Sequence, residues 1–221
     1  MKVILIPVTP FQQNSSLLIC ERTQRAAAVD PGGDLDRIEH EISRHGVRLE
    51  KVLLTHGHLD HCGGADELAR RHDVPIEGPH TDDLFLLESL PAQAARLGFG
   101  DGRAFEPARW LAEGDAVSVG EITLRVRHCP GHTPGHVIFF QPENRLALVG
   151  DVLFAGSIGR TDLPRGNQTD LIRSIVEKLW PLGEDVTFVP GHGPVSTFGD
   201  ERRGNPYVGD DVTGYGGVAR V

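Results

Sequence analysis

The chain has 221 residues, of which 39% are hydrophobic and 24% are charged. This size and balance are typical of one globular domain with a substantial core, and no apolar run approaches the roughly 20 residues of a membrane span. The formal net charge of -9 disfavours nucleic acid as a partner, because phosphate binding requires concentrated Lys and Arg. Cys20, Cys62 and Cys129 are widely spaced, so they predict small core residues rather than a disulfide framework.

The N-terminal part of the chain predicts strands followed by one helix. Residues 3–8, 16–20 and 26–29 are apolar enough to form strands. The helix is expected to begin at Asp34, a residue type that caps helices, and to stop at Gly46. The first apolar run is too short for the core of a secretory signal and no small-residue cleavage site follows it, so we expect a cytoplasmic protein.

A dense group of polar side chains follows the next predicted strand, residues 51–54. The stretch from Thr55 to His61 reads THGHLDH, with three histidines and one aspartate within six residues. Imidazole and carboxylate groups are ligands that zinc, iron and manganese accept. A buried strand that ends in such a stretch delivers its side chains to the edge of a sheet, where α/β proteins commonly place their chemistry. The stretch therefore predicts a metal site.

The rest of the chain alternates between helical and strand patterns. Helical spacing is seen in three segments, of which the second is interrupted by Pro91: 65–71, 82–97 and 168–179. Strand patterns are seen in six segments: 75–78, 116–119, 122–127, 137–140, 146–149 and 186–189. The Gly- and Asp-rich end predicts a flexible C-terminal tail at 209–221, which leaves a single domain at 1–208.

Three more candidate ligands follow predicted strands. His132 lies in PGHTPGH after the strand at 122–127, Asp151 lies in VGD after 146–149, and His192 lies in PGHG after 186–189. The pattern of apolar strand, small residue and ligand thus occurs four times, which predicts that these side chains meet at one edge of the fold.

The HxHxDH stretch with the later His, Asp and His resembles the metallo-β-lactamase superfamily over nearly the whole chain. The resemblance implies an α/β fold, the four-layer αββα sandwich, with a metal site along one edge of the sheets. It implies that Asp151 bridges two groups of ligands and that Asp30 supports them from behind. The two implied groups are His56, His58 and His132, and Asp60, His61 and His192.

The implied ligand set favours metal-dependent hydrolysis. Seven protein ligands are too many for one tetrahedral metal but suit two divalent ions, for which zinc is favoured and iron or manganese also fit. Metal-bound hydroxide is then the nucleophile, and Asp60 and Asp151 are the expected catalytic carboxylates.

The segment 154–164, FAGSIGRTDLP, is similar to the short bacterial glyoxalase II-like hydrolases. This similarity implies a small-molecule thioester as substrate, S-lactoylglutathione or a related acylglutathione. The lysine and tyrosines with which full-length enzymes hold glutathione are not matched here. We therefore predict that Arg160, assisted by Arg202 or Arg203, meets the carboxylates of glutathione.

Two other functions stay open from the sequence. Persulfide dioxygenases share the GRTD stretch at 159–162 and use one iron held by two histidines and one aspartate, which here would be His56, His132 and Asp151. His136, in the HTPGH form, leans towards the hydrolase. A hydrolase of another small ester or lactone is the second alternative. The sequence also leaves the native metal and the oligomeric state open.

Overall fold

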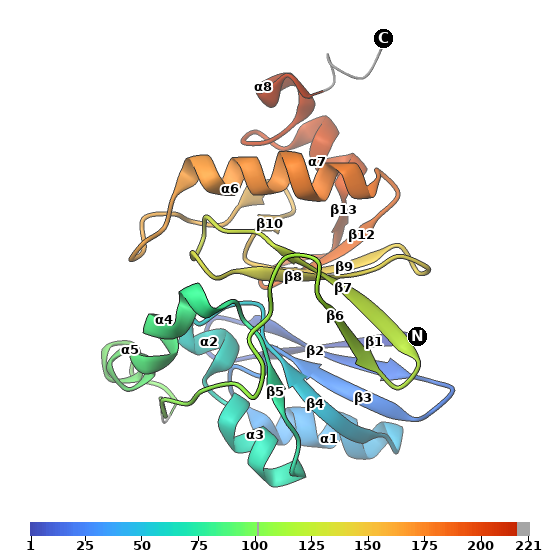
Figure 1. Cartoon of the computed structure of the whole chain (residues 1–221), viewed down its shortest axis with the longest axis vertical. Helices are drawn as coiled ribbons and strands as arrows, with labels where there is room; N and C mark the ends of the chain where they lie inside the picture. Colours follow the sequence, from blue (N-terminus) through green and yellow to red (C-terminus); the bar gives the residue numbers. More distant parts are fainter. Residues whose placement is uncertain (101, 216–221) are drawn as a thin grey trace.

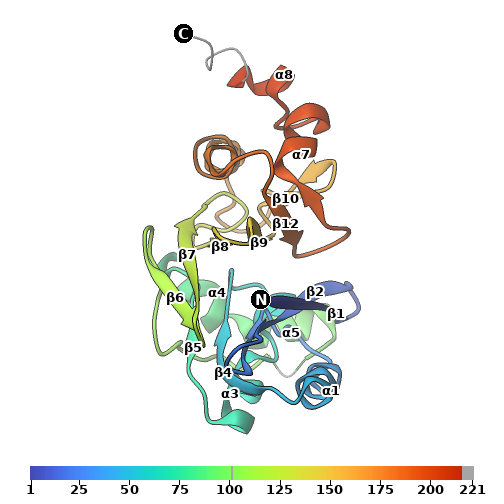
Figure 2. The same cartoon turned by 90° about the vertical axis from the view of Figure 1, so that its right-hand side faces the viewer.

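A computed structural model describes residues 1–100 and 102–215. Two β-sheets lie face to face, and helices cover the outer face of each (Figure 1). The view turned by 90° shows the same four layers, with α1 and α3 outside one sheet and α7 outside the other (Figure 2). The predicted α/β sandwich with αββα layers is therefore confirmed.

The first sheet and its helices come from the first half of the chain. Its five strands, in spatial order, are β1 (Lys2–Val8), β2 (Gln13–Cys20), β3 (Arg25–Val29), β4 (Arg48–Leu53) and β5 (Ile76–Glu77). The helices of this half are α1 (Leu35–His45), α2 (Leu59–Cys62), α3 (Ala65–His72), the short η1 (Thr81–Asp83), α4 (Leu84–Glu88) and α5 (Leu90–Leu97).

The second sheet comes from the second half. Its spatial order is β13 (Ser196–Thr197), β12 (Thr187–Pro190), β9 (Leu146–Gly150), β8 (Val137–Gln141), β7 (Ile122–His128) and β6 (Ala116–Val119), and a small hairpin pairs β10 (Leu153–Phe154) with β11 (Ser157–Ile158). The helical segments are α6 (Gln168–Ser174), η2 (Ile175–Leu179), η3 (Trp180–Leu182), α7 (Phe198–Gly204) and α8 (Asp210–Thr213). Among the described residues, every helix is too short or too polar to span a membrane.

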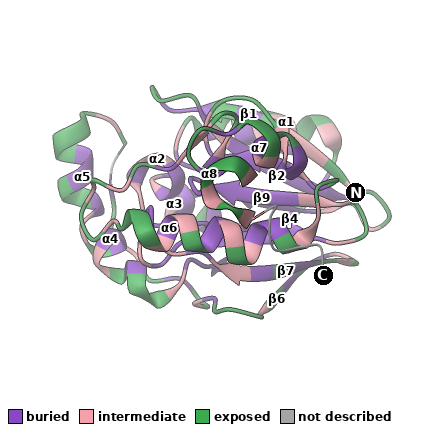
Figure 3. Ribbon diagram, turned by 90° about the horizontal axis from the view of Figure 1, so that it is seen from above, coloured by how far each residue is buried: buried purple, intermediate pink, exposed green. Residues whose placement is uncertain are grey.

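Alternation along the strands divides the core into layers. In β3, Ala26 and Ala28 face the helices, whereas Ala27 faces the second sheet. In β8, Phe139 packs between the sheets and its neighbour Phe140 packs under the outer helices. Successive side chains of a strand point to opposite faces, so an unbroken apolar run supplies both layers at once. The view from above shows the central strand β9 almost wholly buried (Figure 3).

Strand direction brings the candidate ligands together. β3 and β4 are parallel in the first sheet, and β9 and β12 are parallel in the second. β7 also runs parallel to β9, because both are antiparallel to β8. The carboxyl ends of parallel strands lie at the same edge of a sheet, so the loops that follow β4, β7, β9 and β12 meet at one edge of the sandwich.

Two local predictions differ from the structure. The helix predicted for 168–179 is α-helical only to Ser174 and continues as the π-helical turn η2. Along this segment Leu171, Ile175 and Leu179 are buried, and the other apolar positions are partly buried. Asp34 does not cap α1 with its side chain, because it has a left-handed backbone with φ 46° and its carboxylate accepts the Thr9 N–H at 2.9 Å. That contact holds the β1–β2 turn against the start of α1.

The C-terminal segment is packed further along than the sequence suggested. Val208 is fully buried in the second outer core cluster, and Tyr215 packs against the same cluster. Asp210, at the start of α8, forms an ion pair with Arg202 at 2.9 Å. The predicted domain end at 208 is therefore not the end of the packed chain. The rest of the predicted tail, 216–221, lies outside the described residues.

The first prediction tests this packing. Val208→Ala removes two buried methyl groups and should lower the unfolding free energy by roughly 2 kcal/mol, which corresponds to a Tm lower by about 4–8 °C for a chain of this size. Val212→Ala is the control, since Val212 is 58% exposed and lies four residues further along the chain. Scanning calorimetry at matched metal content measures both variants. Equal melting temperatures for the two variants would show that the segment contributes nothing to the core.

Candidate metal centre

The structure brings together all seven predicted ligands. Ligand atoms of His56, His58 and His132 lie within 4.8 Å of one another, and so do those of Asp60, His61 and His192. Asp151 lies between the two groups, with Oδ1 3.3 Å from Nε2 of His61 and Oδ2 3.6 Å and 3.7 Å from Nε2 of His132 and His192. This grouping matches the one that the resemblance implied.

Hydrogen bonds behind the cluster fix the first histidine. The hydroxyl of Thr55 donates its one hydrogen to Asp30 Oδ2 at 2.6 Å, and it lies 3.0 Å from Nδ1 of His56. Nδ1 must therefore carry the proton and donate it to Thr55, which leaves the lone pair on Nε2 of His56 facing the centre. Asp30 also accepts the N–H of Thr55 at 2.7 Å, so its carboxylate holds the start of the ligand loop.

Three more histidines are oriented in the same way. Nδ1 of His61 donates to Asp30 Oδ2 at 3.0 Å, Nδ1 of His132 donates to the Arg160 carbonyl at 2.8 Å, and Nδ1 of His192 donates to the Phe11 carbonyl at 3.2 Å. Each ring therefore turns Nε2 inwards. An outward bond of this kind fixes the tautomer of metal-binding histidines in general.

The donor atoms at the centre fit divalent metal ions. Among the described residues, His56 Nε2, His61 Nε2 and Asp151 Oδ1 are buried without a hydrogen-bond partner. Leaving each such atom unsatisfied costs about 1–3 kcal/mol. Nδ1 of His58 and Nε2 of His132 are 3.0 Å apart, close to the separation of about 3.3 Å that two nitrogens on one tetrahedral zinc ion would have. Neutral imidazoles and carboxylates are the matching ligand types.

Charge divides the centre into two unlike halves. Burial, reinforced by the neighbouring histidines, lowers the pKa of His56 and brings the pKa of His58 to about 3, so both rings are neutral at pH 7. Burial also opposes the charged form of His61, but Asp151 and Asp60 outweigh it and raise the pKa of His61 well above its usual value. The second group thus attracts positive charge, and a metal cation there would take the place of that proton.

Two buried side chains that the sequence did not single out hold the ligand loop from the other side. Gly57 and Leu59, which alternate with the ligands, donate their N–H groups to Asp83 Oδ2 at 2.9 Å and to Gln93 Oε1 at 3.0 Å. Asp83 also accepts the Thr133 hydroxyl at 2.8 Å and the Gly135 N–H at 2.6 Å, both from the loop that carries His132. Asp83 therefore connects the ligand loops of the two sheets.

His136 has a supporting position. Its ring stacks on His56 with centroids 4.7 Å apart, and its Nε2 accepts the N–H of Asp151 at 3.0 Å. Gly150, directly before Asp151, has a φ of 49°, and a Cβ there would lie 2.6 Å from Thr55 Oγ1 and 2.8 Å from the His136 ring. The close packing of these loops therefore requires glycine at position 150.

A cleft of about 860 Å³ opens over the metal ligands. His58, Asp60, His132, Asp151 and His192 line its floor. Its walls come from α4 and α5 on one side and from the segment 154–164 on the other, and they are largely apolar. The apolar wall residues are Phe11, Phe85, Leu86, Ala92, Leu97, Phe154, Ile158, Leu163 and Pro164. The size and lining suit a small-molecule substrate.

The three predicted substrate-binding arginines are in different places. Arg160 lines the cleft. Arg202 does not, because Asp210 and Glu184 hold its guanidinium at 2.9 Å and 3.1 Å. Arg203 pairs with Asp200 at 2.6 Å on the outside of α7. The prediction that Arg202 or Arg203 assists at the substrate therefore does not agree with their placement.

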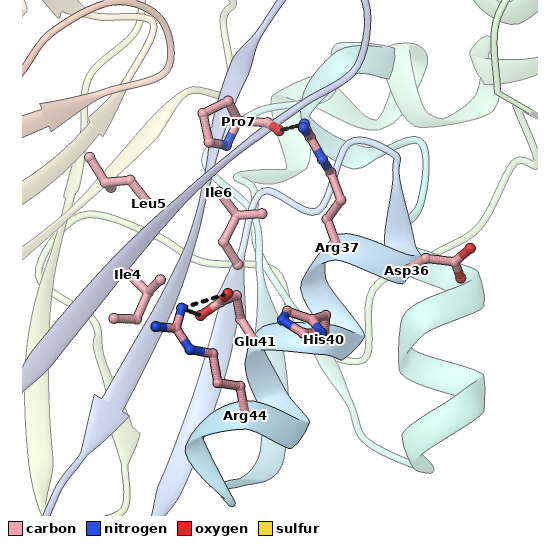
Figure 4. A pocket seen from close by; sticks show the side chains of 9 residues that line it. All are labelled: Ile4, Leu5, Ile6, Pro7, Asp36, Arg37, His40, Glu41 and Arg44. Atoms are coloured by element: carbon pink, nitrogen blue, oxygen red, sulfur yellow. Dashed lines mark hydrogen bonds and ion pairs between the residues drawn. The ribbon is translucent and has the colours of Figure 1, made fainter.

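A second hollow lies far from this chemistry. It has a volume of about 530 Å³ and lies between the edge strand β1 and helix α1 (Figure 4). Arg44 pairs there with Glu41 at 3.2 Å, and Arg37 donates to the Pro7 carbonyl. None of the residues that line this hollow is a predicted ligand, so the cleft over the histidines is the candidate active site.

An αββα sandwich with seven His and Asp ligands at the shared edge of its sheets defines a class, the metal-dependent hydrolases with two neighbouring ligand groups. The profile described as the Metallo-beta-lactamase superfamily matches residues 8–192. The chain belongs to this superfamily, and it is a metallo-hydrolase.

Individual relatives agree with this assignment. Hydroxyacylglutathione hydrolase GloC of Haemophilus influenzae is 46% identical over 209 residues, which cover 94% of this chain and 98% of that protein. The crystal structure of the BLEG-1 B3 metallo-beta-lactamase is similar with a TM-score of 0.86 and 33% identity, covering 94% of this chain and 99% of that one. The structure of TTHA1623 in a di-iron-bound form is similar with a TM-score of 0.84 and 34% identity, covering 92% and 99%.

The second prediction concerns Asp83. In Asp83→Asn an amide NH₂ replaces one of the two acceptor oxygens, so at least one of three buried N–H or O–H donors loses its partner. We expect the unfolding free energy to fall by roughly 3 kcal/mol and the metal affinity to fall about 10- to 100-fold. Asp36→Asn is the control, because Asp36 lies exposed on α1. Metal competition titrations and calorimetry measure the two effects. Metal affinity equal to that of the control would show that Asp83 does not support the ligand loops.

Proposed function

We propose that the protein is a thioester hydrolase with two divalent metal ions, acting on S-lactoylglutathione or a related acylglutathione. The observation that carries the proposal is the complete second ligand group of Asp60, His61 and His192 beside Asp151. A one-metal enzyme of the two-histidine, one-aspartate kind would bind its ion through His56, His132 and Asp151 and would not need this group. The identity with GloC, a hydroxyacylglutathione hydrolase, supports the choice of a glutathione thioester.

The proposed metal assignment follows the hydrogen bonds. His56, His58 and His132 would hold one ion, Asp60, His61 and His192 the other, and Asp151 would bridge, with Asp30 keeping His61 in place from behind. Zinc is the favoured metal, and the di-iron form of TTHA1623 makes iron a reasonable alternative, with manganese also compatible. When bound, two such ions make a water molecule acidic enough to attack at neutral pH and polarise the thioester carbonyl.

Two side chains beside the metal centre have assignable roles in the proposed reaction: Asp60 accepts a hydrogen bond, and Cys62 takes no part. Burial opposes ionisation of Asp60, but His61 and His192 outweigh it and keep its pKa below the usual range, so Asp60 accepts hydrogen bonds at pH 7. We assign to Asp60 the orientation of the attacking water, as the acceptor of one of its protons. Cys62 is not a nucleophile, because burial raises the pKa of its thiol and the thiol donates to the His58 carbonyl.

Arg160 is retained as a proposed contact of the substrate. It lines the cleft beside His132, whose Nδ1 donates to the Arg160 carbonyl. Its guanidinium makes two bonds to Asp162, at 2.7 Å and 2.8 Å. A substrate carboxylate would therefore have to compete with Asp162 for this arginine, which weakens the contact.

The third prediction concerns Asp151. Asp151→Ala removes the carboxylate that lies between the two groups, so metal content should fall to one ion or none and thioester turnover should fall at least about 10²-fold. Metal analysis after dialysis and a thioester assay measure the two effects. Asp36→Ala, on the exposed face of α1, is the control. A variant that keeps two metals and normal turnover would remove Asp151 from the proposed site.

The fourth prediction separates the hydrolase from the dioxygenase alternative. A dioxygenase of the two-histidine, one-aspartate type needs His56, His132 and Asp151 but not His192. His192→Ala should therefore cost the proposed hydrolase at least about 10²-fold in turnover, because an electrostatic stabiliser is lost. Thioester hydrolysis and sulfite formation from glutathione persulfide are measured on both proteins after controlled metal loading.

The two outcomes of this comparison are distinct. Thioester turnover that collapses in the variant, without sulfite in either protein, supports the hydrolase. Sulfite formation by the iron-loaded wild type that the substitution hardly changes would overturn it. Hydrolysis of simple esters or lactones but not of thioesters would keep the metal assignment and replace the substrate class.

A further inference from the structure

The walls of the cleft carry positive side chains, whereas the whole chain has a net negative charge. The protein has 31 acidic residues and 22 Lys and Arg residues. Apart from the metal ligands, however, the charged side chains that line the cleft are two arginines, Arg96 and Arg160. Such a lining attracts an anionic substrate, because a cleft concentrates the field of the charges along its walls.

The two arginines differ in their partners. Arg160 is held by both oxygens of Asp162, which neutralise it. Within residues 1–100 and 102–215, the Arg96 guanidinium takes part in no ion pair and in no hydrogen bond. A third arginine near the cleft, Arg165, is engaged with the ring of Phe85 at 4.0 Å. Of the arginines that line the cleft, Arg96 is therefore the one without a partner among the described residues, so it offers its donors to a ligand.

The other polar groups on the same wall are already engaged. Both side-chain groups of Gln93 are used, since Oε1 accepts from Leu59 and Nε2 donates to the Leu86 carbonyl at 3.0 Å. The hydroxyl of Ser89 also donates to the Leu86 carbonyl, at 2.9 Å. A substrate carboxylate on this wall would otherwise meet apolar side chains, where an unpaired charge is costly. Arg96 is the partner that the wall offers.

Arg96 is also placed with reference to the chemistry. It follows Gln93 by three residues in α5, so the two side chains lie on the same face of the helix about 4.5 Å apart along its axis. Gln93 bonds to the loop between His58 and Asp60. The bond thus fixes the part of α5 that carries Arg96 relative to the loop of candidate ligands.

We propose that Arg96 binds a carboxylate of the thiol portion of the substrate and determines its specificity for anionic thioesters. This inference rests on the proposed thioester hydrolase and adds the residue that recognises the leaving group. An Arg–carboxylate pair remote from the scissile bond contributes equally to ground state and transition state, so its loss should raise KM and leave kcat unchanged.

The test compares Arg96→Gln with Arg48→Gln in the metal-loaded enzyme. Arg48 is an exposed arginine at the start of β4, roughly 20 Å of strand away from the ligand loop, and the control substitution removes the same charge. The substrates are S-lactoylglutathione, with two carboxylates, and the lactoyl thioester of N-acetylcysteamine, which is neutral. Arg96→Gln should raise KM for S-lactoylglutathione about five- to tenfold and leave the neutral substrate unchanged, while Arg48→Gln should match the wild type on both.

Salt provides an independent readout. The KM of wild type for S-lactoylglutathione should rise between low and physiological ionic strength, because an exposed ion pair is screened. The same rise should be smaller in Arg96→Gln. Equal losses on the charged and neutral substrates, or an unchanged KM with the charged one, would overturn the assignment of Arg96 while leaving the hydrolase in place.

Binding keeps the inference testable if the proposed reaction fails. S-Methylglutathione carries the same two carboxylates and cannot be hydrolysed. Calorimetry should give a Kd that is about five- to tenfold weaker for Arg96→Gln than for wild type and Arg48→Gln. An equal Kd for all three proteins would overturn the role of Arg96. Normal discrimination in this binding test, with no turnover of either thioester, would instead contradict the proposed hydrolase alone.

Discussion

Several nitrogen and oxygen atoms that could coordinate a metal face one another in the buried centre and have no hydrogen-bond partner among the described residues. The surrounding structure must hold these atoms in place. His56 Nε2, His61 Nε2 and Asp151 Oδ1 are the clearest cases. Without a cation this arrangement is unfavourable for His56 Nε2, which has lost its water, and it leaves His61 Nε2 and Asp151 Oδ1 only each other at 3.3 Å. The positions of these atoms are stabilised from behind. There each oriented imidazole donates a hydrogen bond from its Nδ1–H to a carboxylate, a hydroxyl or a carbonyl group.

Two buried carboxylates carry most of this support. The Asp30 carboxylate accepts hydrogen bonds from Thr55 and His61, so it holds the ends of β3 and β4 together within the first sheet. Asp83 accepts hydrogen bonds from Gly57 of the first sheet's loop and from Thr133 and Gly135 of the second sheet's loop. It therefore connects the sheets at the edge where the candidate ligands meet. The apolar layer between the sheets brings the two halves together, but only directional bonds of this kind set the positions of atoms to within a few tenths of an ångström.

The segment from η1 to α5 has two roles as a consequence. Asp83 and Gln93 fix the ligand loop, while Phe85, Leu86 and Arg96 of the same segment form a wall of the cleft. A wall of the cleft is therefore part of the same segment that positions the candidate metal ligands. A shift of the backbone of this wall would disturb both binding and metal geometry, whereas the change of one exposed side chain such as Arg96 leaves the backbone in place and should affect binding alone.

The meeting of the candidate ligands could be predicted from the sequence because they lie in one short stretch and after three further strands. The αββα layers could be predicted from the resemblance, and the strands themselves from apolar runs such as the one in β8. Asp83 and Gln93 could not, since their partners are 26 and 34 residues away and an acidic residue in a polar run leaves no pattern. Arg202 was misassigned for a related reason. Its charge was visible, but the ion pair with Asp210, which removes it from the substrate, depends on how the chain folds after α7.

The charges around Asp60 favour two ions over one. The carboxylates of Asp60 and Asp151 share the same histidines, since Nε2 of His192 lies 3.2 Å from Asp60 and 3.7 Å from Asp151, and Nε2 of His61 lies 3.8 Å and 3.3 Å from them. Neighbouring imidazoles keep the pKa of each carboxyl below its usual range, so both carry negative charge at pH 7.

One ion among His56, His58 and His132 would leave the charge of Asp60 to be balanced by protons on His61 and His192, whose pKa values are raised. A second ion replaces those protons with a fixed charge, and its binding must then release protons, because a protonated imidazole has no lone pair to coordinate a metal. His61 and His192, which would stay protonated beside a single ion, would therefore lose their protons and coordinate the second ion.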